Sequence, residues 1–296
     1  MVTERTSSLP IAAAGEAIAS ARSPRHGGGL TAAKAVAATV VAAILVFLVL
    51  PTLIIVPMSL SETAYLQFPP QGLTLDWYGA YFSDADWMAS TWFSLQIALA
   101  TSLAATVVGT LTALAIGKGD LPFKGLVQAM ALGPMIVPHV VLGVALYLVF
   151  SPLHLTGTFV GFLVAHTVLA VPFVVITVTA ALQRLDPALE LAALNCGASR
   201  AQPFTLITMP NIPPGIAAGA VFAFIASFDE ATVAFFLSDE GGKPIGRKMF
   251  EDIDFNLTPV IAAASTVIVS ASLCLIGIAH LISSARRINS KEGRPE

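Results

Sequence analysis

Two adjacent carboxylates, Asp229 and Glu230, stand in an otherwise apolar part of the sequence and are the residues best suited to bind a cation there. The 28 residues before them, 201–228, contain no Asp, Glu, Lys or Arg. A carboxylate in apolar surroundings is costly unless it faces a cavity or a partner. Neighbouring helix positions point about 100° apart, so one carboxylate can face a cavity and the other a neighbouring helix. A cation-lining site, a structural bond and a break in the helix all remain open.

Motifs for other chemistry are missing from the chain. It contains no G-x-x-x-x-G-K-[ST] phosphate loop, no G-x-S-x-G nucleophile turn and no H-E-x-x-H helix. The two cysteines, Cys196 and Cys274, form no disulfide framework or metal-binding motif. The five histidines also lack ligand spacing: His26, His139, His154, His166 and His280. The sequence therefore predicts a protein that is not an enzyme, with no cofactor or metal bound by this chain.

The composition indicates that the helices lie in a membrane. Of 296 residues, 56% are hydrophobic and 11% are charged, whereas soluble domains contain about 25% charged residues. So few charges cannot cover the surface of an ordinary cytosolic enzyme, and a nucleic-acid-binding chain would be more polar and usually basic. A lipid bilayer is the remaining solvent that suits this chain.

Long charge-free windows predict an all-α membrane protein with six spans, because a spanning helix needs roughly 20 apolar residues. The expected spans lie near 35–59, 92–116, 127–150, 158–181, 214–237 and 259–283. Residues 1–33 are expected to form a disordered tail, residues 34–285 the transmembrane domain, and residues 286–296 a second tail. Prolines should kink two spans (Pro134, Pro138 and Pro172), and glycines should mark close helix packing (Gly109, Gly143, Gly161 and Gly219).

The positive charges predict the orientation. Of the 15 Lys and Arg residues, 12 fall in residues 1–34, in loops 117–125 and 182–213 and in residues 286–296, and three fall in loop 238–258. Cations favour the cytoplasmic side, so both termini are expected in the cytoplasm and the protein in the cell inner membrane as a multi-pass chain. Aromatic residues between Trp77 and Trp92 suit either an interfacial belt or a packed external loop.

The loop 182–213 contains its own helix signals. Asp186 followed by Pro187 is typical of a helix start, and Gly197 suits the left-handed position after a helix end. The helix between them is mostly apolar. Such a helix at a membrane surface must be covered by lipid, by the protein's own core or by a cytoplasmic partner.

This loop resembles a known signature. Ala192-Ala193, Gly197-Ala198-Ser199 and Ile207-Thr208-Met209-Pro210 are similar to the cytoplasmic-loop motif of permease subunits of binding-protein-dependent ABC importers of the type I fold. Two positions depart from that motif. Leu191 stands where the family usually has Glu, with Glu190 one position earlier, and Met209 replaces the usual Leu.

The resemblance implies a type I permease core over about residues 90–285 and several partners. These are two ATPase subunits that carry ATP and Mg, a second homologous permease, a soluble binding protein that docks outside on loops 60–91 and 238–258, and membrane lipid, but no nucleic acid. The implied ATPase contact consists of Glu190, Leu191, Ala192, Ala193, Gly197, Ala198, Ile207 and Pro210. The candidate translocation path consists of Asp229, Glu230 and His139.

The acidic pair and the segment 171–186 are also similar to the spermidine/putrescine branch of this family. A polyamine is therefore the first expected substrate. An amino-acid derivative, a phosphonate or ferric iron remain alternatives within the family. A self-sufficient secondary transporter is the alternative outside it.

Overall fold

The structure is a computed structural model that describes residues 27–199, 201–239, 242–255 and 257–292. Regular structure in these residues is helical, apart from one isolated bridge between Asp239 and Gly242. The chain divides into two units, residues 1–54 and 55–296. All described residues of the first unit belong to helix α2 (Gly27–Met58), which begins inside the segment expected to be the tail. The rest of that tail lies outside the described residues.

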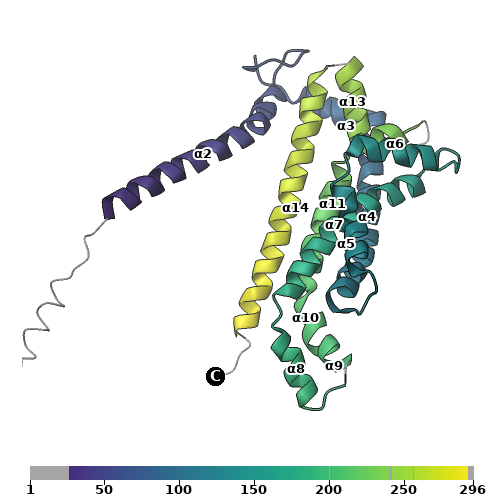
Figure 1. The fold of residues 1–296 in the computed structure, drawn as a ribbon. Helices are drawn as coiled ribbons and strands as arrows, with labels where there is room; N and C mark the ends of the chain where they lie inside the picture. Colours follow the sequence, from purple (N-terminus) through teal and green to yellow (C-terminus); the bar gives the residue numbers. More distant parts are fainter. Residues whose placement is uncertain (1–26, 200, 240–241, 256, 293–296) are drawn as a thin grey trace, which may run out of the picture. The chain divides into compact units, whose positions relative to one another are not determined.

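Three helices form the centre of the second unit: α4 (Ala85–Lys118), α7 (Phe159–Gln183) and α11 (Pro213–Phe228) (Figure 1). Glycines allow them to approach closely, as the sequence predicts. A Cβ atom at Gly109 would lie 2.6 Å from Cβ of Val174, and one at Gly219 would lie 3.0 Å from Cα of Val174. Gly143 likewise faces the ring of Phe236, but Gly161 faces only the turn before its own helix.

Replacing Gly219 with Val is therefore expected to force α11 away from α7. Overpacking of this kind costs about 1–3 kcal/mol, because the backbone of Val174 cannot move aside as a flexible side chain can. Thermal unfolding in detergent should show a lower midpoint for this variant. Gly125→Val is the control, since no atom lies within 4 Å of a Cβ built there. Equal midpoints for the two variants would contradict the close approach.

The third predicted span is not one straight helix. Helix α5 (Lys124–Leu132) runs into a 3-10 turn (Gly133–Met135), and helix α6 (His139–Phe150) then leaves at an angle of 103°. The prediction of a continuous span over 127–150 is wrong, whereas a bend near Pro134 and Pro138 is confirmed. Proline lacks the N–H that would continue the helix ladder.

The fifth predicted span, 214–237, is also interrupted. Helix α11 ends at Phe228, three residues follow without helical structure, and helix α12 (Thr232–Leu237) completes the segment. The interruption falls on the acidic pair, so the third open interpretation, a break in the helix, is correct. In contrast, α7 continues through Pro172 as a single helix.

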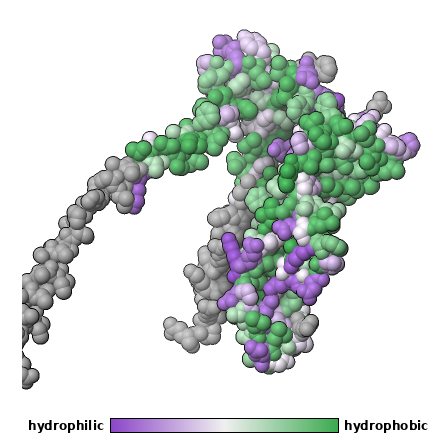
Figure 2. Space-filling view, viewed as in Figure 1, coloured by the Kyte–Doolittle hydropathy of each residue, from purple (hydrophilic) through white to green (hydrophobic). Residues whose placement is uncertain are grey.

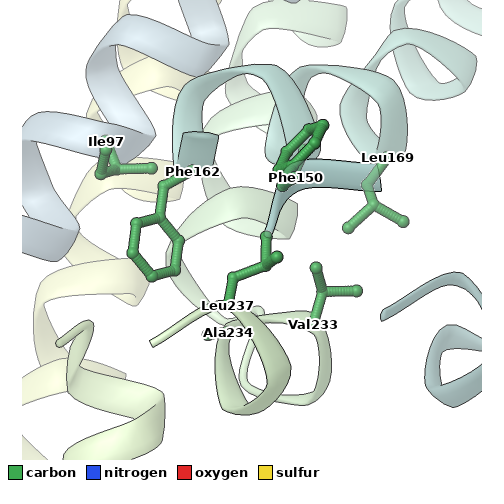
Figure 3. Close-up of a cluster of buried hydrophobic side chains, with 8 residues drawn as sticks. Ile97, Phe150, Phe162, Leu169, Val233, Ala234 and Leu237 are labelled. Carbon is green, nitrogen blue, oxygen red and sulfur yellow. The ribbon is translucent and has the colours of Figure 1, made fainter. Parts of the chain in front are cut away.

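The short helices α6 and α12 are held by an apolar cluster that also includes α4 and α7 (Figure 3). Phe150 of α6, Phe162 of α7 and Leu237 of α12 are almost completely buried in it. The other members shown are Ile97, Leu169, Val233 and Ala234. This cluster fixes the positions of the two interruptions relative to the central helices.

Three helices, Lys34–Met58, Ala85–Lys118 and Phe159–Gln183, are long and apolar enough to cross a membrane, and up to five spans result if each bent pair counts as one. The apolar segment Pro259–Cys274 of helix α14 (Pro259–Glu292) is shorter, so six spans are not established within the described residues. Helix α14 also extends past residue 283, the end predicted for it. Large apolar side chains are exposed on the second unit (Figure 2), as lipid contact requires.

At one end of the second unit lie α3 (Asp76–Ser83) and α13 (Ile245–Phe255), and at the other end lies α8 (Pro187–Asn195) (Figure 1). The aromatic residues near α3 differ in burial. Tyr81 and Trp87 are buried, whereas Trp92 is 60% exposed.

Candidate functional site

The two interrupted spans meet at Glu230. One carboxylate oxygen of Glu230 accepts a hydrogen bond from the backbone N–H of Val233 (2.8 Å), and the other lies 3.0 Å from Nδ1 of His139, the first residue of α6. The Glu230 side chain is only 6% exposed. Glu230 therefore caps the start of α12 and joins it to α6, which is the structural bond that the sequence left open for one member of the pair.

The other side of the break is fixed by a second histidine. Nδ1 of His166 in α7 is hydrogen-bonded to Oγ of Ser227, at 2.9 Å, and both side chains are buried. Ser227 lies in the last turn of α11. The break between α11 and α12 is thus held by one polar contact before it and one after it.

Asp229 lies between these two contacts and differs from its neighbour. It is exposed, and its carboxylate makes no hydrogen bond or ion pair within the described part of the chain. The sequence predicts that one carboxylate of the pair can face a cavity while the other bonds a helix. In the structure Glu230 forms the bond to another helix and Asp229 is exposed, and a break in the backbone separates them rather than the 100° step of a continuous helix.

Among the described residues, no group of three or more His, Cys, Asp or Glu side chains could hold a metal ion. Glu230 pairs with His139, and His166 pairs with Ser227, in two separate contacts. The chemistry available at the break is therefore electrostatic: a fixed backbone with one exposed carboxylate.

The loop 182–213 folds locally as the sequence predicts. Helix α8 begins at Pro187, and the Asp186 carboxylate accepts a hydrogen bond from the backbone N–H of Ala188 (2.9 Å). Gly197 has φ +88°, a left-handed conformation that favours glycine. Three short helical segments follow before α11: α9 (Ala201–Pro203), a π-helix (Phe204–Thr208) and α10 (Met209–Asn211).

Helix α8 has no buried residue. Its leucines Leu189, Leu191 and Leu194 are 52%, 61% and 40% exposed. Ala192 is also exposed, and Ala193 and Ala198 are half-buried. The chain's own core does not cover this apolar helix. Of the three covers that the sequence allows, lipid and a cytoplasmic partner therefore remain.

Glu190 is the exception on α8, because its carboxylate faces its own chain. One oxygen lies 2.7 Å from Nζ of Lys118 at the end of α4, and the same oxygen accepts a hydrogen bond from the hydroxyl of Thr208. Sequence reasoning placed Glu190 among the ATPase contacts and did not find Lys118 or Thr208 as its partners. Lys118 is 72 positions away in sequence, and no local signal pairs the two.

Acidification should release this contact. The Lys118 ammonium and the Thr208 hydroxyl hold the pKa of Glu190 below its ordinary value of 4.5. A lowered carboxyl pKa stabilises the folded chain above the ordinary value, and this contribution is lost as pH falls through the lowered pKa. The midpoint of thermal unfolding of the unaltered chain should therefore exceed that of Glu190→Gln near pH 7, and the difference should shrink below pH 4.5. A difference that grows on acidification would contradict this contact.

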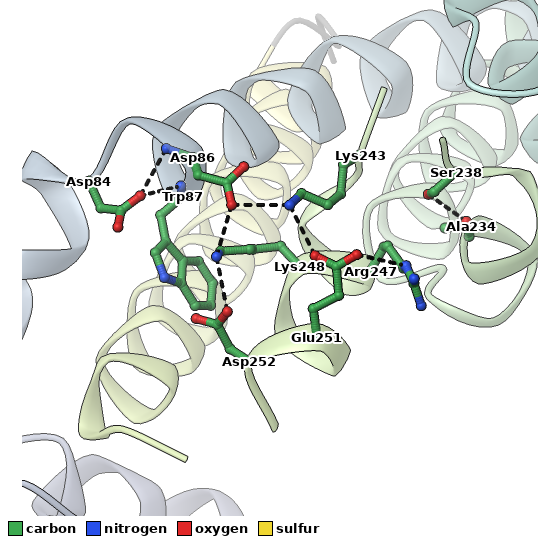
Figure 4. Close-up of polar contacts among 10 residues, drawn as sticks. All are labelled: Asp84, Asp86, Trp87, Ala234, Ser238, Lys243, Arg247, Lys248, Glu251 and Asp252. Atoms are coloured by element: carbon green, nitrogen blue, oxygen red, sulfur yellow. Dashed lines mark hydrogen bonds and ion pairs between the residues drawn. The ribbon is translucent and has the colours of Figure 1, made fainter. Parts of the chain in front are cut away.

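A charged network occupies the opposite end of the second unit (Figure 4). Lys243 bridges Asp86 and Glu251, both at 3.0 Å, and Lys248 bridges Asp86 and Asp252, both at 2.9 Å. Burial lowers the pKa of each lysine, but the facing carboxylates outweigh it and the pKa of each is raised. Several acids of the expected docking loops are therefore paired within the chain.

This network borders a hollow of about 590 Å³. Its lining is of mixed charge and includes Asp86, Asp239, Glu251, Lys243 and Arg247. The network ties α13 to the start of α4, where the Asp84 carboxylate caps the helix by accepting from the backbone N–H groups of Asp86 and Trp87. The network thereby fixes the position of α13 relative to the start of α4 at this end of the second unit.

Long apolar helices, and helices interrupted at polar contacts, are typical of membrane transport proteins. The chain belongs to the family described as "Binding-protein-dependent transport system inner membrane component", whose sequence profile matches residues 105–288. Members of this family are permease subunits of ABC importers, and this chain is one of them.

Two curated relatives are polyamine permeases of Escherichia coli (strain K12). The chain is 27% identical to the spermidine/putrescine transport system permease protein PotC over 241 residues, which is 81% of this chain and 91% of PotC. It is 29% identical to the putrescine transport system permease protein PotI over 219 residues, which is 72% of this chain and 76% of PotI.

Solved structures share the fold. A chain of a bacterial ABC transporter involved in the import of the acidic polysaccharide alginate matches with a TM-score of 0.68 at 18% identity, and the match covers 90% of this chain and 99% of that one. A chain of an amino acid ABC transporter matches with a TM-score of 0.51 at 16% identity, over 69% of this chain and 98% of that one. These matches support the type I importer fold expected from the loop motif.

Proposed function

We propose that the chain is the permease subunit of an importer for polyamines such as spermidine or putrescine. The observation that carries this proposal is the exposed carboxylate of Asp229 at a break whose flanks are fixed by Glu230 and Ser227. A carboxylate that is paired with no other group in the described part of the chain can bind a substrate ammonium group, and the fixed backbone means that little conformational entropy is lost in ordering it. The similarity to PotC and PotI supports this substrate class.

In this proposal the path includes Asp229 as the substrate ligand, while Glu230 and His139 keep the break in position. Glu230 is already satisfied by Val233 and His139, so it is a positioning residue. Helix α14 supplies the sixth span, and both termini lie in the cytoplasm.

Energy comes from two separate ATPase subunits that bind ATP and Mg. The uncovered leucines of α8 dock onto them, together with Ala192, Ala193, Gly197, Ala198, Ile207 and Pro210. A second homologous permease completes the membrane pathway, and a soluble binding protein docks at the α3–α13 end. One of the matched structures is of the alginate transporter "in complex with alginate pentasaccharide-bound periplasmic protein".

Gentle solubilisation and identification of co-purifying subunits test the assembly. An ATPase and a second permease should co-purify, and the assembled transporter with its binding protein should import labelled spermidine or putrescine into liposomes only when ATP is supplied to the ATPase. Uptake by the purified chain alone, driven by an ion gradient, would instead indicate a secondary transporter. ATP-driven uptake of a phosphonate, an amino-acid derivative or ferric iron without polyamine uptake would support the ABC importer but contradict a polyamine as its substrate.

A further inference from the structure

The position of α8 depends on polar contacts. A helix is normally fixed by an apolar face that packs on its neighbours, but α8 buries none of its residues. Its side-chain hydrogen bonds to other parts of the chain come from Glu190, apart from the local cap by Asp186. Besides its packing on α9 and the π-helix, α8 is therefore joined to other elements of the described structure by the side chain of Glu190.

The partners of Glu190 lie on two separate elements. Lys118 is the last residue of α4, which packs along its length on α7 and α11. Thr208 is fully buried and ends the π-helix that leads through α10 into α11. A π-helix is rare and often occurs at functional sites. One carboxylate thus joins α8 to the central helix α4 and to the π-helix that precedes α10 and α11.

We propose that Lys118, Glu190 and Thr208 form the link that passes movement of α8 to α4 and α11. The proposal rests on the proposed docking of an ATPase to α8. One face of α8 then contacts the ATPase through Leu191 and Leu194. The other face contacts the remaining helices of the permease through Glu190. Glu190 is a positioning residue that couples the two, not a contact of the ATPase.

The charges explain why this contact can transmit movement. The side chains of Lys118 and Glu190 are 30% and 25% exposed, so water screens the pair less than it screens a fully exposed one. A charge-assisted hydrogen bond is about twice as strong as a neutral one. When α8 moves, the cost of separating Glu190 from both partners favours a joint movement of α4 and the π-helix.

The test uses the complete transporter with its ATPase, partner permease and binding protein in liposomes. The variants are Glu190→Ala, Lys118→Met and the charge swap Lys118→Glu with Glu190→Lys. The measurements are the amount of ATPase that co-purifies and the substrate imported per ATP hydrolysed. Lys124→Met is the matched control, because Lys124 lies at the other end of the same short connection and forms no ion pair with the residues that the structure describes.

Each single variant should retain the ATPase but import roughly 2- to 30-fold less substrate per ATP, and the charge swap should restore most of this loss. A purely structural role would lower the amount of assembled transporter, which the co-purification measures separately. Loss of the ATPase in Glu190→Ala would overturn the proposal, because Glu190 would then be a direct contact. Unchanged coupling in both single variants, or a swap that restores nothing, would also overturn it. Failure of the unaltered chain to retain an ATPase would refute the proposed function instead.

Discussion

Asp229→Asn is expected to reduce polyamine uptake roughly 10- to 100-fold while the transporter still assembles. A hydrogen bond to a charged group contributes about 1.5–3 kcal/mol, and each 1.4 kcal/mol corresponds to about a factor of 10 in affinity. Asn has nearly the same shape as Asp but carries no charge, and Asp229 is exposed without a partner in the described residues. The variant should therefore weaken substrate binding without destabilising the fold. Uptake of labelled spermidine into liposomes measures it.

Two variants make this result specific. Asp229→Glu keeps the charge and should retain much of the uptake, whereas Glu230→Gln should lower the thermal stability, because Glu230 is buried against Val233 and His139. Normal uptake by a well-assembled Asp229→Asn transporter would contradict the proposal that Asp229 binds the substrate in the path.

Leu191→Asp is expected to release the ATPase from the permease. The side chain is 61% exposed on an apolar helix that the chain itself does not cover. If the ATPase covers this position, the variant places an unpaired charge in an apolar contact, and truncating a central contact residue already costs about 2 kcal/mol or more. The amount of ATPase that co-purifies should fall at least about 30-fold, and ATP-driven uptake should fall with it.

Leu153→Asp is the matched control. Leu153 is also 61% exposed, but it lies in the turn between α6 and α7, away from α8 (Figure 1). This variant should retain the ATPase. If Leu191→Asp retained as much ATPase as Leu153→Asp, the exposed face of α8 would not be the docking surface.

Local features were predictable from the sequence because neighbouring residues encode them. The start of α8 at Pro187 with its Asp186 cap, and the left-handed Gly197 after its end, each depend on the chemistry of one turn. The bend near Pro138 follows from the missing N–H of proline. Length and charge-free windows were enough to predict apolar helices of spanning length, and three of them are present.

The partners of the charged residues were decided by the tertiary structure. Nothing near Glu190 in sequence indicates that Lys118 and Thr208 will bind it, and nothing near Glu230 indicates His139. Adjacent residues in both acidic and loop motifs also differ in role: Asp229 is exposed beside the buried Glu230, and Leu191 is exposed beside the paired Glu190.

The sequence by itself determined that the chain is a helical membrane protein with a helix in its long loop. Composition and local capping suffice for that, since each residue adds to them independently of distant ones. The permease class came from the resemblance of the loop motif to a known family. Which side chains are exposed and which are paired with the chain's own helices depended on how α4, α6, α7, α11 and α12 pack. The reason is physical: a helix rotated by one residue turns its side chains by about 100°, and only contacts between helices fix that rotation.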